Sequence, residues 1–164
     1  MSKYTYPLGM GVKLRDPRTG VEGHLTRLLF NQEGCVEAEL EVVTDEPLGG
    51  KKIEHKIFQA QRLIAADGGD PGKFKGKSDV VLGKEYRDSQ SKLQGHAAVI
   101  EFNEDMATRI YLKSVTIAVG GGQKLTYHTI DDYLLEDVET KEQPKDRTKK
   151  PSPAPQEIDP GLTR

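Results

Sequence analysis

The chain has 164 residues, with 24 lysines and arginines against 26 aspartates and glutamates, a formal net charge of −2 and one cysteine, Cys35. A single cysteine excludes an intrachain disulfide and a cysteine-based zinc site. The near-neutral charge disfavours a protein that binds by neutralising many phosphates. No apolar run reaches the roughly 18 residues of a membrane span.

The first residues, MSKYTYPLGMG, lack a basic stretch followed by an apolar one, so no signal peptide is expected. We therefore expect a protein of a virion or of the host cytoplasm. It should be neither secreted through a signal peptide nor membrane-spanning.

The dominant feature of the sequence is a long internal repeat. Without a gap, residues 8–64 (the first repeat) align with residues 80–136 (the second repeat), with 14 identities in 57 positions. The opening segment GVKLRDPRTGVEGH at 11–24 recurs as GKEYRDSQSKLQGH at 83–96. A repeat of this length predicts two similar folded units.

Each repeat has the pattern of five short strands. In the first, the sequence predicts a short strand at 11–15, a turn at 16–20, a long strand at 21–30, a strand at 35–43, a strand at 52–58, and a 3₁₀ turn with a brief strand at 59–64. Gly23 near the start of the long strand indicates a bulge or a sharp bend. In the strand at 35–43 apolar residues alternate with Glu37, Glu39 and Glu41, which is typical of a half-buried antiparallel strand.

The second repeat has the same succession of segments, and neither repeat shows a helical period. Five strands in so short a segment favour a closed barrel, because closure removes edges that so small a unit cannot cover. The predicted fold class is all-β, with two tandem SH3-like small β-barrels related by internal duplication, plus a disordered C-terminal tail.

The expected boundaries follow from composition. The first barrel covers 1–65 and the second covers 80–138, with an irregular Gly/Pro-rich linker at 66–79 in which Phe74 is expected to pack on a barrel. Residues 139–164 are rich in proline and charge, and we expect a flexible tail or arm there.

One polar pattern is kept in both repeats, an Arg-Asp pair followed at the same spacing by Gly-His. Its charged and histidine side chains are the candidate binding site: Arg15, Asp16, His24, Arg87, Asp88 and His96. Two interpretations stay open. Either these side chains meet at one end of each barrel and bind a carboxylate, a phosphate or a partner loop, or the aspartate organises the turn while the others bond locally.

No catalytic, metal or cofactor site is expected. The four histidines, His24, His55, His96 and His128, lack the spacing and the carboxylates of a metal site. The segment GGGQK at 120–124 lacks the spacing of a phosphate-binding P-loop. We expect the protein not to be an enzyme.

The segment DPRTGVEG at 16–23 resembles the D-x-x-T-G-x-x-G opening motif of small phage and prophage SH3-like β-barrel proteins. The segment Asp132-Tyr133-Leu134-Leu135 resembles their closing D-x-x-L element, whereas the second repeat departs from the opening motif at Ser91-Lys92. This resemblance implies the barrel fold and a viral origin, and it assigns no catalytic residue.

Three classes of function remain. The leading expectation is a non-enzymatic phage-type assembly or virion accessory that acts through protein–protein contacts with itself or with other virion subunits. The alternatives are a protein that binds a host factor or a small ligand, such as a defence inhibitor, and a nucleic-acid-binding module. Nucleic acid is the least favoured partner, because such a role requires a local patch such as Lys51, Lys52 and Lys56.

Overall fold

The computed structural model describes residues 1–105 and 108–138 and shows an all-β protein, as the sequence predicts. The strands of the first repeat are β2 (Lys13–Arg15), β3 (Glu22–Asn31), β4 (Val36–Asp45), β5 (Lys51–Gln59) and β6 (Ile64–Ala65), with the 3₁₀ turn η1 (Ala60–Arg62) before β6. Those of the second are β8 (Glu85–Asp88), β9 (Gln94–Asn103), β10 (Thr108–Ile117), β11 (Gln123–Asp131) and β12 (Leu135–Asp137), with η2 (Asp132–Leu134) before β12. Two further strands, β1 (Ser2–Tyr6) and β7 (Phe74–Ser78), lie outside the repeats.

The expected 3₁₀ turn before the last strand is confirmed in both repeats. The expected tail at 139–164 lies outside the described residues. Over 1–105 and 108–138, no helix is long and apolar enough to cross a membrane.

The strand pairing is the same in both repeats. The first repeat has the order β6-β2-β3-β4-β5 and the second has β12-β8-β9-β10-β11, with every pair antiparallel. Each long strand carries an irregularity at the same place, between Leu25 and Arg27 in β3 and opposite Tyr111/Leu112 in β9. The predicted bend near Gly23 is therefore a bulge a few residues further on.

Gly23 and its counterpart Gly95 have a different role. A Cβ on Gly23 would lie 2.5 Å from the carbonyl oxygen of Glu41, and one on Gly95 would lie 2.8 Å from that of Lys113. The glycine is thus required because the neighbouring strand approaches too closely for any side chain.

The prediction of closed barrels is wrong. Within the described residues β5 does not pair with β6, and β11 does not pair with β12, so neither repeat closes on itself. The physical reason lies in β3 and β9, whose distal halves pair with each other instead. The other repeat thus covers the part of β3 and of β9 that would otherwise be an exposed edge, while β5 and β11 pair on one side only in the described residues.

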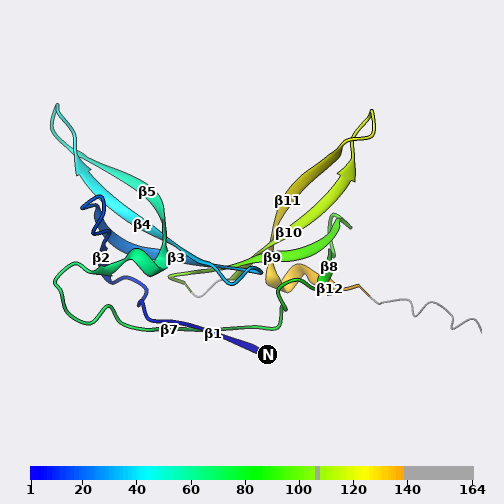
Figure 1. Cartoon of the computed structure of the whole chain (residues 1–164), viewed down its shortest axis with the longest axis horizontal. Helices are drawn as coiled ribbons and strands as arrows, with labels where there is room; N and C mark the ends of the chain where they lie inside the picture. The colour runs from blue at the N-terminus through cyan, green and yellow to red at the C-terminus, as the bar shows by residue number, and fades with distance from the viewer. Residues whose placement is uncertain (106–107, 139–164) are drawn as a thin grey trace, which may run out of the picture.

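The β3–β9 pairing has a two-fold arrangement. Leu29 lies opposite Glu101, its own counterpart in the second repeat, so the centre of the ladder is an approximate two-fold axis. The resulting sheet runs β5-β4-β3-β9-β10-β11, and its two ends, β4–β5 and β10–β11, rise as separate hairpins on one side (Figure 1). We call these two hairpins the arms.

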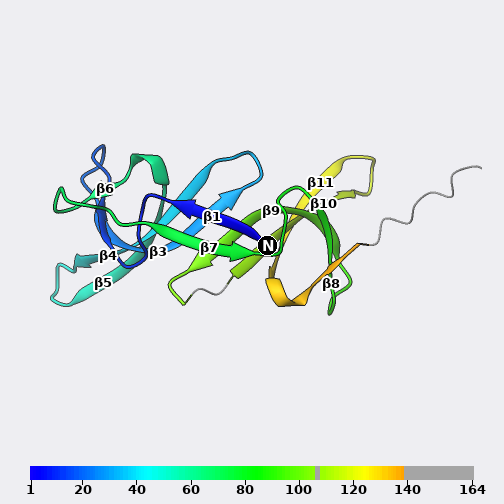
Figure 2. The same ribbon diagram turned by 90° about the horizontal axis from the view of Figure 1, so that it is seen from below.

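The other side of this sheet is covered by a ribbon of two antiparallel strands, β1 and β7, which run side by side beneath the junction (Figures 1 and 2). The residues expected to form an irregular linker therefore end in a strand. Phe74 is 3% exposed and packs as expected. Its ring lies 6.0 Å from that of Phe30 and 5.1 Å from that of Phe102, the equivalent phenylalanines of the two repeats.

Tyr4 of β1 completes this aromatic cluster, with ring centroids 5.3 Å from Phe30 and 5.5 Å from Phe102. Phe30 and Phe102 themselves meet edge to face at 5.7 Å. Aromatic pairs at such distances contribute beyond the area they bury. The two repeats consequently share one hydrophobic core, and the ribbon covers it at the junction of β3 and β9.

Candidate functional site

In the repeated polar pattern the aspartate lies on a different face of the sheet from the arginine before it. Arg15 and Asp16 are neighbours at the end of a strand, so their side chains leave opposite faces of the sheet. Asp16 is fully buried, whereas His24 is exposed and pairs with Lys13 in the ladder. In the second repeat Arg87 reaches Glu136, and His96 is again exposed.

Asp16 organises the turn that follows it. Its carboxylate accepts hydrogen bonds from the Arg18 N–H at 3.2 Å and from the Thr19 hydroxyl at 2.8 Å. The Arg62 guanidinium from η1 donates to it at 2.6 Å. Burial alone raises the pKa of Asp16, but the bonds from Thr19, the Arg18 N–H and Arg62 outweigh burial and lower that pKa.

Asp88 has the same role in the second repeat with one different partner. It accepts hydrogen bonds from the Ser91 hydroxyl and from the Gln90 N–H at 3.0 Å, and His128 Nε2 lies 3.3 Å away. The Ser91 bond contributes most to lowering the pKa of Asp88 to about 2, ahead of the Gln90 N–H. These bonds match the turn-organising interpretation of the motif.

A cavity distinguishes the second repeat. Arg62, which donates to Asp16, has Leu134 as its counterpart in the second repeat. A cavity of about 560 Å³ opens there, lined among others by Asp88, Ser91, Arg109 and His128. The surroundings of the two aspartates therefore differ, because an arginine bonds Asp16 where Leu134 stands in the second repeat.

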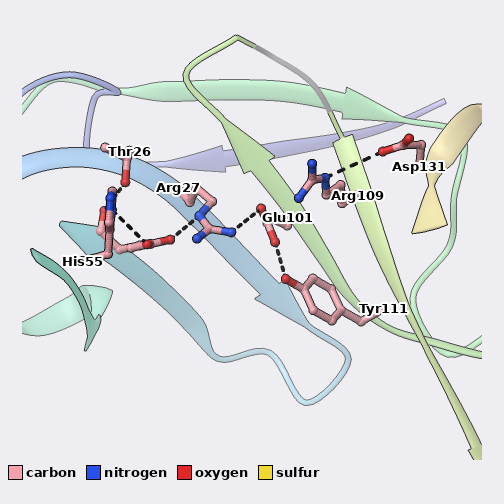
Figure 3. Close-up of polar contacts among 8 residues, drawn as sticks. Thr26, Arg27, His55, Glu101, Arg109, Tyr111 and Asp131 are labelled. Carbon is pink, nitrogen blue, oxygen red and sulfur yellow. Dashed lines mark hydrogen bonds and ion pairs between the residues drawn. The ribbon is translucent and has the colours of Figure 1, made fainter. Parts of the chain in front are cut away.

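A polar network on the upper face of the sheet, the face opposite the ribbon, was not anticipated. Its residues come from five different strands: Arg27, Glu39, His55, Glu101 and Tyr111. Figure 3 shows Arg27, Glu101 and Tyr111 side by side, with His55 beyond Arg27. Arg27 pairs with Glu39 across the β3–β4 ladder and with Glu101 of the other repeat at 2.9 Å. His55 Nδ1 lies 3.2 Å from Glu39, and the Tyr111 hydroxyl donates to Glu101.

Burial makes this network energetically important. The side chains of Glu39 and Glu101 are 4% and 2% exposed, whereas that of Arg27 is 37% exposed. Burying a carboxylate is costly unless it is paired, and Arg27 is the positive charge that both glutamates share, beside the further bonds from His55 and Tyr111. The hydrogen bond to Glu39 does most to raise the pKa of Arg27, while burial followed by the Glu101 bond raises the pKa of Tyr111 to about 12.

The sequence pattern assigns Glu39 to the polar face of its strand correctly but does not show that it is buried. One feature of the sequence could have indicated the network, namely that its charged residues have no charged counterparts in the other repeat. Arg27, Glu39 and Glu101 align with Val99, Tyr111 and Leu29. The network is therefore asymmetric, although the backbone around it is nearly two-fold symmetric.

The arms carry exposed apolar residues at equivalent positions. Val43 lies opposite Ile53 in the first arm, and Val115 lies opposite Leu125 in the second. Their exposed fractions are 50%, 58%, 56% and 53% in that order. All four lie on the upper face, since they alternate in register with Glu39 and Tyr111.

Metal ligation has no support in the part of the chain that is described, where no group of three or more His, Cys, Asp or Glu side chains could hold an ion. The glycines at 120 and 121 adopt positive φ in the tight turn between β10 and β11. That geometry is a hairpin connection rather than a phosphate cradle.

Replacing Asp88 by asparagine should reduce the loss of unfolding free energy that occurs as the pH falls below about 4, which we call the acid limb. The folded-state pKa of Asp88 is about 2, below its unfolded value of 3.8. The unfolded chain therefore binds more protons as the pH falls from about 4 to about 2, and the wild type loses stability across that window. Urea unfolding midpoints at several pH values between 5 and 2 measure the difference.

Ser91→Ala is the matched variant for this experiment, since it removes the strongest contribution to the shift and keeps the charge. It should flatten the acid limb partway. An acid limb as steep in Asp88→Asn as in the wild type contradicts this assignment.

Arg27→Met should lower the free energy of unfolding by about 3 kcal/mol. Breaking a buried ion pair by removing one partner costs roughly 3–5 kcal/mol, and the partial exposure of Arg27 favours the lower end. Arg109→Met is the control, because the Arg109–Asp131 pair is 3.7 Å long with side chains 52% and 45% exposed. Arg109→Met should lower the free energy of unfolding by less than about 1 kcal/mol. Equal decreases for the two variants in denaturant titrations refute the special role of Arg27.

Comparison with protein-family models, with curated proteins and with solved structures finds no match for this chain. The function is therefore argued from its own geometry.

Proposed function

We propose that this chain is a non-enzymatic assembly protein of phage type, a virion or assembly accessory that works through protein–protein contacts. In this proposal its two repeats are SH3-like units derived from one duplicated ancestor. The strand order β6-β2-β3-β4-β5, with a 3₁₀ turn before the last strand, supports that interpretation. The resemblance of residues 16–23 to the opening motif of small phage proteins supports a phage origin.

The observation that carries the proposal is the pair of apolar surfaces on the arms. Val43 and Ile53 form one cross-strand pair, and Val115 and Leu125 form the equivalent pair. All four side chains are at least 50% exposed, although polar residues could occupy these positions. Single exposed apolar residues are ordinary, but the same pair at both equivalent positions is a repeated surface feature. Such a surface is suited to a contact with protein.

The occupant proposed for the arms is a second copy of this chain. A contact between identical copies around a two-fold axis requires a self-complementary patch, and uncharged apolar pairs meet that requirement. The chain already joins its two similar units around an approximate two-fold axis, through the pairing of β3 with β9. In addition, β5 and β11 each pair on one side only in the described residues, which leaves long edges open to another strand.

The double variant Val43→Lys, Val115→Lys should convert a self-associating wild-type chain into a monomer, because it places charge in each apolar pair. Sedimentation velocity over a range of concentrations measures the change, and circular dichroism checks that the fold is kept. The matched control is Val81→Lys, Leu93→Lys, which alters residues 49% and 51% exposed outside the arms. The control should still associate.

A wild-type chain that stays monomeric at every concentration contradicts the proposal. So does a double variant that associates as well as the control.

A second candidate function, binding of a small polar ligand, is favoured by the cavity beside Asp88. Arg62 fills the equivalent space in the first repeat, so Leu134→Arg should place a guanidinium within reach of Asp88 and fill the cavity. Fragments detected by ligand-observed NMR on the wild type should then lose binding, with the melting temperature maintained or raised. Fragments that bind both proteins equally lie elsewhere, and this candidate fails.

A further inference from the structure

The β1–β7 ribbon has two chemically different faces. Its inward side chains, among them Tyr4, Tyr6 and Phe74, are buried or half-buried in the aromatic cluster. Its outward side chains are Lys3 and Thr5 of β1 and Lys75 and Lys77 of β7, and all four are exposed. The alternation of the strands therefore places three lysines and no large apolar side chain on the outside.

The lysines face one another across the ribbon. Lys3 lies directly opposite Lys77, and Thr5 lies opposite Lys75. Like charges at opposite positions destabilise a strand pair. Among residues 1–105 and 108–138, no ion pair joins any of these three lysines to a carboxylate. The next outward position, Asp79, marks the end of the basic surface.

The lysines of β5 provide a contrast within the same chain. Lys52 and Lys56 both contact Glu54, at 2.9 Å and 3.6 Å, and Lys51 lies opposite Asp45. The patch that seemed basic in the sequence is therefore largely neutralised. The uncompensated positive surface lies on the ribbon instead.

The outward face also holds a cavity of about 430 Å³, lined by Lys3, Thr5, Lys75, Gly76 and Lys77. Figure 2 shows the ribbon nearest the viewer across the underside, with the arms pointing away. The lysines thus lie on the outer surface of the ribbon, on the side of the molecule opposite the arms (Figure 1).

We propose that this ribbon binds the phosphate backbone of a nucleic-acid duplex. The major groove of B-DNA admits a two-stranded β-ribbon, and lysine ammonium groups contact phosphates as point charges. The aromatic residues of the ribbon point inward, so bases of a single strand have no stacking surface. The outward face also lacks the apolar side chains that insert into a lipid surface.

Three lysines set the size of the effect. Each neutralised duplex phosphate contributes about −0.9 to the slope of log K against log salt concentration, so the slope should be about −2.7. The association constant should accordingly fall about 40-fold between 50 mM and 200 mM salt. Binding should depend little on sequence, because phosphate contacts carry no base information.

The test measures fluorescence anisotropy of a labelled mixed-sequence DNA duplex with the full-length chain over a series of NaCl concentrations. Lys3→Gln, Lys75→Gln, Lys77→Gln should lose at least tenfold in affinity at low salt and most of the salt slope. The control Lys51→Gln, Lys52→Gln, Lys56→Gln has the same net charge and should bind as the wild type. The melting temperature of the ribbon variant should be unchanged or higher, since like-charge repulsion is relieved.

The proposal is overturned if the wild type does not bind duplex at the lowest salt concentration of the series, or if the two triple variants lose affinity equally. Tighter binding to a single strand of the same length, or binding to anionic vesicles of phosphatidylserine and phosphatidylcholine but not to duplex, overturns it as well. None of these outcomes depends on self-association through the arms, which the sedimentation experiment tests separately.

Discussion

The antiparallel pairing of β3 with β9 is the contact on which the rest of this structure depends. It merges two open sheets into one and gives the distal halves of β3 and β9 a partner on the side that no strand of their own repeat covers. It also brings Phe30 and Phe102 together, and this apolar junction requires the cover that β1 and β7 supply. On the opposite face the same pairing brings Arg27 within reach of Glu101.

Comparison of equivalent positions separates what holds the fold from what has diverged. Two pairs of residues kept in both repeats act structurally: Gly23 and Gly95 allow a close strand approach, and Asp16 and Asp88 hold the turns. The differences fall where new chemistry arises, as at Arg62 and Leu134, where one repeat fills a space and the other leaves a cavity. Lys92 occupies the position of Gly20 and keeps a positive φ of 63°, so this replacement of glycine introduces backbone strain.

Much of the backbone was predictable because it depends on local patterns. Alternating apolar residues predicted the strands, and the repeat predicted the same succession of strands in each half of the chain. Closure was predicted wrongly, because sequence patterns within one repeat do not show that its edge pairs with β9 of the other repeat. The ribbon was missed for the same reason: the segment FKGKS at 74–78 is a strand only because β1 lies beside it. The Arg27 network likewise joins residues far apart in the chain, so its buried glutamates looked like ordinary surface charges.

The two faces of the molecule differ in how their charges are compensated, and this bears on how the proposed functions fit together. On the upper face the buried glutamates are matched by Arg27, and the exposed residues of the arms are apolar. On the ribbon three lysines remain uncompensated in the described chain. Association through the arms would bring two upper faces together and leave both ribbons on the outside. Such a dimer would present two basic ribbons facing away from each other, a geometry that joins two duplex segments rather than one.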